Sequence, residues 1–154
     1  MNTMLLTFIS LSSFLSFQPL ASNQGLLDSE IFSFQVEYPD NQSKTFASED
    51  EFYAKLDKKL YTEYENAAYS MRKKIFFHEV PDAELIFRTK TNLPGEKWNI
   101  SSFPFIHPNR QVYFLASFQQ NEKEEFHKYT IIDAETNTVL LGGNHYHLYD
   151  NPYK

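Results

Sequence analysis

The segment His145-Tyr146-His147 carries the residues best suited to do chemistry in this chain. Because residues two apart in a β-strand lie on the same face, both imidazoles can approach one metal ion. Zinc takes four ligands in most sites, and His127, Glu125 and Asp150 are candidates to complete the set. The alternative is a C-terminal edge strand whose polar face carries two histidines. We favour that alternative because no H-E-x-x-H motif accompanies the pair.

The residues that other chemistries need are missing from the sequence. There is no cysteine, which excludes disulfides, thiolate metal sites and a lipid anchor on a lipobox cysteine. No G-x-S-x-G sequence positions a nucleophilic serine, and the four glycines form no phosphate-binding loop. We therefore expect no catalytic residue and no cofactor, and we favour a protein that is not an enzyme.

The net charge and the aromatic content limit which partners the chain can bind and what kind of core it can form. The formal net charge is −6 at pH 7, and the only basic cluster is Arg72-Lys73-Lys74. A protein that binds the phosphate backbone needs a basic surface, so we expect no nucleic-acid partner. Aromatic residues make up 17% of the chain, which is enough to build a core without disulfides. We expect one domain over residues 31–154.

The N-terminal segment has the pattern of an export signal. The first 27 residues contain no Asp, Glu, Lys, Arg or His, and residues 4–17 form an apolar run interrupted by serines and one threonine. Pro19 ends this run, and a cut after Ser22 fits the small-residue rule for cleavage. We expect a signal peptide at 1–22, a polar leader at 23–30, a secreted or cell-envelope location and no stable membrane span after cleavage. The segment has no Lys or Arg, so an uncleaved anchor and a buried or disordered segment of a cytosolic protein remain alternatives.

The first half of the domain predicts a strand and then a long helix. Phe32, Phe34, Val36 and Tyr38 alternate with polar residues, which predicts a half-buried strand over residues 31–38. Ser48 and Glu51 have the spacing of a capping box, which indicates the start of a helix. Apolar residues then recur at three- and four-residue steps, so we predict one helix from 49 to 74. Pro81 is expected to prevent any continuation.

The second half predicts strands joined by short turns. We expect strands at 85–90, 111–119, 126–132, 138–141 and 145–149. Val112, Phe114, Ala116 and Phe118 alternate with Tyr113, Leu115 and Ser117, so the second of these strands has two distinct faces. Turn-forming residues at 133–137 indicate a hairpin, and Gly142-Gly143 indicates a strand end or a bulge. The predicted fold is α+β, with one long helix packed on a mostly antiparallel sheet of four to five strands.

Residues 129–140, with the sequence Tyr-Thr-Ile-Ile-Asp-Ala-Glu-Thr-Asn-Thr-Val-Leu, resemble the closing hairpin of PepSY-type domains. Asn137 stands where such hairpins usually have glycine. The resemblance covers residues 127–143 and implies a small secreted bacterial domain with a cystatin-like roll. It also implies a protein that binds or inhibits a peptidase, and it carries over no catalytic residue.

The long loop from Thr91 to Arg110 is the best candidate for a binding surface. It holds Trp98, Phe103 and Phe105, and rigid aromatic side chains make good contact anchors. The alternative is that these rings cover one end of the sheet. Our first hypothesis is an exported, non-enzymatic domain that binds a protein or peptide partner. The second is a metal-binding or hydrolytic protein with His145 and His147 on a cystatin-like or NTF2-like sheet.

Overall fold

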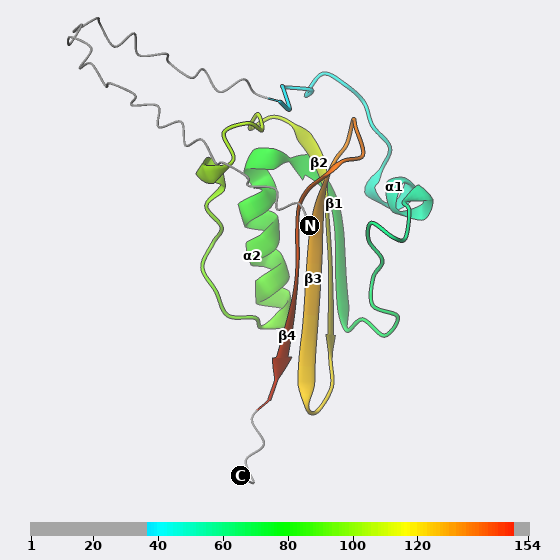
Figure 1. The fold of residues 1–154 in the computed structure, drawn as a ribbon, viewed down its shortest axis with the longest axis vertical. Coiled ribbons are helices and arrows are strands. Elements are labelled where there is room, and N and C mark those ends of the chain that lie inside the picture. The colour runs from blue at the N-terminus through cyan, green and yellow to red at the C-terminus, as the bar shows by residue number, and fades with distance from the viewer. Residues whose placement is uncertain (1–36, 150–154) are drawn as a thin grey trace, which may run out of the picture. The chain divides into compact units, whose positions relative to one another are not determined.

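An antiparallel sheet organises the part of the chain that the structure, a computed structural model, describes, which is residues 37–149 (Figure 1). Its four strands are β1 Tyr69–Phe76, β2 Gln111–Gln120, β3 Glu124–Asp133 and β4 Val139–Leu148. The strand order is β1-β2-β3-β4, so each strand pairs with its neighbour in sequence. The α-helices are α1 Glu49–Lys55 and α2 Val80–Thr91, and the 3₁₀ helices Phe77–Glu79 and Ile100–Ser102 complete the described elements. The α+β class is thereby confirmed.

Both faces of the sheet are covered, because β2 sends apolar side chains to each. One face, here the α2 face, carries the even-numbered side chains of β2, and these pack with α2. Members of that cluster include Val112, Phe114, Ala116, Phe118, Val80, Ala83 and Phe87. The other face, here the α1 face, carries Tyr113 and Leu115 together with Leu56 and Tyr61 from the segment after α1. The predicted strand at 111–119 and its two faces are confirmed.

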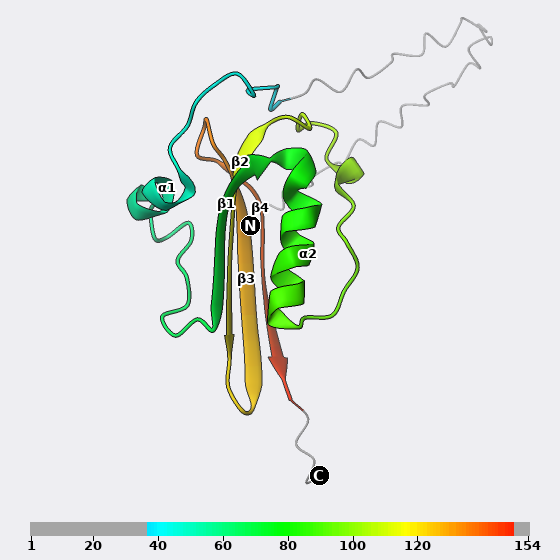
Figure 2. The ribbon, with the colours of Figure 1, turned by 180° about the vertical axis from the view of Figure 1, so that it is seen from behind.

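Local signals explain the two helices. At the start of α1, Glu51 N–H donates to the Ser48 hydroxyl, and Ser48 N–H donates to the Glu51 carboxylate, which confirms the predicted capping box. α2 has Pro81 in its first turn, where a missing N–H breaks no helical hydrogen bond. It ends at Asn92, whose positive φ of 56° closes the last turn. Figure 2 shows α1 and α2 on either side of the sheet.

The long helix predicted over residues 49–74 is wrong. α1 ends at Lys55, and residues 69–76 form β1 instead. Asp57 turns the chain after α1, because its carboxylate accepts from Lys59 N–H and its carbonyl accepts from Leu60 N–H. Met71 and Ile75, which fit the helical stripe, also fit the two-residue period of a strand together with Tyr69. Pairing with β2 buries Met71, and this tertiary contact overrides the helical pattern.

The strand predicted at 85–90 is also wrong, because those residues lie inside α2. The strands predicted at 138–141 and 145–149 form one strand, β4, and Gly142-Gly143 pairs regularly within it. The shift in register falls earlier, where Ile131 pairs with Leu141 and Ile132 with Val139. The described residues hold four strands and no fifth. The strand predicted at 31–38 falls mostly outside them, and Tyr38 makes an isolated bridge to Ile106.

A polar cluster holds the hairpin between β3 and β4 against the start of β2. Arg110 Nε and Nη2 donate to the Asp133 carboxylate at 2.6 and 2.9 Å, and both side chains are buried. The same carboxylate accepts from Thr136 N–H, and a further Arg110 nitrogen donates to the carbonyl of Pro39. The hairpin predicted at 133–137 is confirmed, and Asn137 takes the left-handed conformation, with φ 59°, that glycine usually supplies.

This cluster should make the fold sensitive to acid. Burial raises the pKa of Asp133, but the hydrogen bonds from Arg110 and Thr136 outweigh burial and hold the pKa below its ordinary value. The folded state therefore binds fewer protons than the unfolded state, whose Asp titrates near pH ~3.9. The stabilisation is complete above that pH and is lost as the pH falls through the folded pKa. Urea unfolding measured from about pH 6 down to about pH 3 should show this fall.

The Asp133→Asn variant provides the matched comparison. At neutral pH it should lower the free energy of unfolding by about 3–5 kcal/mol, because Arg110 loses a buried ionic partner. It should also reduce the fall below pH ~4. Asp50→Asn is the control, since Asp50 pairs with Arg72 at an exposed site and should change stability little. Equal effects from the two substitutions would contradict the role given to Asp133.

Candidate functional site

β4 is an edge strand without the usual protection of an edge. It pairs only with β3, and no other strand of residues 37–149 lies on its outer side. Natural edge strands usually carry charges, prolines or strong bulges that prevent another strand from pairing with them. None of the ten residues from Val139 to Leu148 is Lys, Arg, Asp, Glu or Pro. Tyr146 and Leu148 are 52% and 58% exposed, so the strand combines an open edge with exposed apolar surface.

β1, the opposite edge of the sheet, is protected. It contains the basic cluster Arg72-Lys73-Lys74. Arg72 binds the carboxylates of Glu63 and Asp50, and Lys74 Nζ donates to the carbonyl of Phe46 at 2.9 Å. The two edges of one sheet therefore differ in charge, and only β4 presents an uncharged edge.

A small pocket of about 320 Å³ lies on the α2 face of β4, near the start of the strand. Trp98 and Tyr129 form its wall, with ring centroids 4.6 Å apart in an edge-to-face arrangement. We call this the Trp98 pocket. Its lining residues are Trp98, Asn99, Ile100, Ser102, Phe103, Tyr129, Leu141 and Gly142. The lining is mostly apolar, so the pocket suits an apolar side chain.

Gly143 allows the Tyr129 ring to lie against β4. The two residues pair across β3 and β4, and a Cβ atom on Gly143 would stand 2.9 Å from the Tyr129 ring. A Cβ on Gly142 would meet its nearest atom at an ordinary 3.5 Å. The glycine at 143 is thus required by packing, and it fixes the ring on which Trp98 rests.

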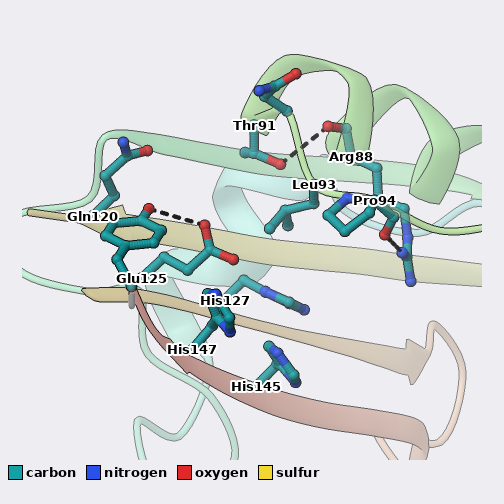
Figure 3. Close-up of a pocket in the computed structure, with 11 residues that line it drawn as sticks. Arg88, Thr91, Leu93, Pro94, Gln120, Glu125, His127, His145 and His147 are labelled. Carbon is teal, nitrogen blue, oxygen red and sulfur yellow. Dashed lines mark hydrogen bonds between the residues drawn. The ribbon is translucent and has the colours of Figure 1, made fainter. Parts of the chain in front are cut away.

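A larger pocket of about 550 Å³ lies farther along the same face, between the end of α2 and the far halves of β3 and β4 (Figure 3). We call it the histidine pocket. Its lining residues are Arg88, Thr91, Asn92, Leu93, Pro94, Gln120, Glu125, His127, His145, His147 and Tyr149. His127 pairs with His145 across the strands, and Glu125 pairs with His147. Because the pairs are two residues apart on each strand, all four side chains share the α2 face.

Arg88 and His127 set the electrostatics of the histidine pocket. Arg88 pairs with the buried Glu84 and donates to the carbonyl of Pro94, so its charge is largely compensated. Burial lowers the pKa of His127, and the nearby His145 and Arg88 lower it further. His127 is therefore neutral at pH 7. Its Nδ1 is buried and has no hydrogen-bond partner among residues 37–149.

The structure brings some of the predicted site residues together and separates others. Trp98 and Phe103 line one pocket, and Phe105 does not, although all three pack partly buried against the core. His145 and His147 share the histidine pocket with His127 and Glu125, whereas Asp150 lies outside the described residues. As they stand, no three His, Asp or Glu side chains of residues 37–149 form a set that could hold a metal ion.

Sequence reasoning missed Arg88, Thr91 and Tyr129 as pocket residues. Arg88 and Thr91 line the histidine pocket because residues 80–91 are helical, and the pattern had predicted a strand there. Pro81 in a first helical turn was the available signal. Tyr129 could have been placed beside Gly143 by aligning the hairpin, because the two residues are cross-strand partners.

Comparison with known proteins places the chain in no family. No protein-family model, no curated protein and no solved structure matches it. Within residues 37–149, neither helix has the length and apolar character needed to cross a membrane.

The packing of Tyr129 on Gly143 gives a direct test of this description of β4. Gly143→Ala should lower the free energy of unfolding by about 1–3 kcal/mol, because the new methyl group collides with the Tyr129 ring. Gly142→Ala is the matched control, because its methyl group fits and restricts the unfolded chain. Urea unfolding, with Trp98 fluorescence as the probe, measures both. A Gly143→Ala variant as stable as Gly142→Ala would contradict the packing.

Proposed function

We propose that this chain is an exported, non-enzymatic binding domain that takes an extended segment of a partner polypeptide along the outer edge of β4. The observation that carries the proposal is that β4 contains no Lys, Arg, Asp or Glu and, within residues 37–149, pairs with β3 alone. Main-chain hydrogen bonds along such an edge supply affinity, and pockets for alternate side chains supply specificity. Export is supported by the apolar, uncharged N-terminal sequence.

The two pockets lie where alternate side chains of a docked strand would fall. The residues of β4 that face the α2 side are Leu141, Gly143, His145 and His147. A strand paired with β4 continues this two-residue period, so every second side chain would lie on the same face. A side chain beside Leu141 would lie near the Trp98 pocket, and one beside His145 near the histidine pocket. We therefore expect the partner residue beside Leu141, near the Trp98 pocket, to be apolar.

The lack of charged residues on β4 indicates that a partner strand covers this edge rather than that the edge stays open to solvent. An open strand without Lys, Pro or acidic residues is an aggregation hazard for a free protein. The same sheet protects β1 with three consecutive basic residues, so the contrast lies within one domain. A strand that is covered by a partner in its working state needs no such protection.

Selection from a library of random peptides displayed on phage tests the proposal. Selected peptides should bind the purified chain with extended, alternating sequences that contain a large apolar residue. The double variant Tyr146→Lys with Leu148→Lys should weaken this binding on the order of tenfold or more, since it adds charge and removes apolar contact area along the edge. Fluorescence anisotropy of a labelled peptide measures the affinity.

The control makes the same chemical change away from β4. Leu85 and Ile86 are exposed apolar residues of α2, at 40% and 43% exposure. The double variant Leu85→Lys with Ile86→Lys should bind the peptide as the unchanged chain does. The proposal would be contradicted if both double variants weakened peptide binding equally. It would also be contradicted if the β4 double variant bound the peptide as tightly as the unchanged chain. Sedimentation evidence that the free chain dimerises through β4 would contradict it as well, because a second copy would then be the occupant.

A further inference from the structure

Three of the five histidines of the chain lie together in the histidine pocket. His127 and His145 are direct cross-strand partners, with ring centroids 5.0 Å apart, and His147 lies two residues along the same strand. His78 and His107 lie elsewhere, near Pro108 and Asn109. A pair of histidines two apart on one strand, with a third opposite on the next strand, places three imidazoles on one face of the sheet.

We infer that His127, His145 and His147 form a binding site for a first-row transition-metal dication such as Zn²⁺. Three imidazole ligands with an open fourth position are an established coordination set for zinc. Neutral imidazole nitrogens also bind nickel and copper, so the site is assigned to this class of metal and not to one member of it. The metal site needs no docked peptide, because its ligands face the α2 side and not the open edge. A partner side chain beside His145 would lie next to the bound metal.

The rings must turn to close the site. As they lie, no three side chains within residues 37–149 form a complete set, so the metal has to draw the imidazoles together. The backbone already fixes their origins through the regular pairing of β3 and β4. His145 and His147 are exposed, and no hydrogen bond within the described residues holds either ring. His145 stacks on His127 and His147 contacts the Tyr149 ring, so a rotation breaks only these ring contacts. His127 contributes a buried Nδ1 that accepts no hydrogen bond from any described part of the chain.

The charged side chains that line the histidine pocket are compatible with a bound cation. Glu125 faces the pocket beside His147 and supplies negative charge, with one carboxylate oxygen bound by the Tyr149 hydroxyl at 3.1 Å. Arg88 is the only other permanently charged residue of the lining, and it is paired with Glu84. The second oxygen of Glu125 or a water molecule can therefore complete the coordination.

Titration calorimetry of the tag-free full chain with ZnCl₂ tests the site. We expect one Zn²⁺ per chain with a Kd on the order of micromolar or tighter, and a rise in the unfolding temperature on saturation. Each of His127→Ala, His145→Ala and His147→Ala should weaken binding on the order of tenfold or more, because each removes one ligand. Co²⁺ bound at the same site should give the visible absorption of a four-coordinate site with three nitrogen ligands, and each variant should lose it.

A double variant, His78→Ala with His107→Ala, is the matched control, because it removes the two histidines outside the pocket. It should bind Zn²⁺ as the unchanged chain does. Circular dichroism checks that each variant is folded. Zn²⁺ binding no tighter than roughly 100 μM, equal loss in the control, or binding that survives all three pocket substitutions would overturn the inference.

Discussion

Arg110 and Asp133 form an ion pair that is sealed from solvent at the point where β2 begins and β3 ends. The pair joins three segments that are distant in sequence, because Arg110 also binds the carbonyl of Pro39 and the carboxylate of Glu135. Asp133 in turn accepts hydrogen bonds from the backbone of the turn that leads into β4. The direction in which β4 leaves this turn sets its register on β3, and therefore the position of every side chain in both pockets.

The two edge strands of the sheet, β1 and β4, differ in charge. β1 carries a run of basic residues and is tied to the segment around α1 by Arg72 and Lys74. β4 contains no Lys, Arg, Asp or Glu and lies beside two pockets on its α2 face. Packing of Tyr129 against Gly143 places Trp98 at the first pocket, and the end of α2 places Arg88 at the second. The features proposed to bind a partner and a metal thus depend on one strand and its register.

The amino-acid pattern predicted β2 and the hairpin between β3 and β4, but it mispredicted β1 and α2. β2 was predictable as a short run of apolar residues that supplies side chains to both faces of a sheet. The hairpin after β3 was predictable from Asp133 to Asn137, whose side chains favour a turn. Residues 69–76 fit both a helical and a strand period, and burial against β2 decided between them. Within the site, His145 and His147 could be placed on one face, but the approach of His127 depends on the hairpin register. The contribution of α2 could not be foreseen from a segment that was taken for a strand.

Residue-by-residue amide hydrogen exchange, followed by NMR with and without a selected peptide, tests most directly whether β4 is a docking edge. The account predicts that the peptide slows exchange at the outward-facing amides of residues 139–148 and leaves the amides of β1 unchanged. Slowed exchange on β1 or around α1, with β4 unaffected, would contradict it.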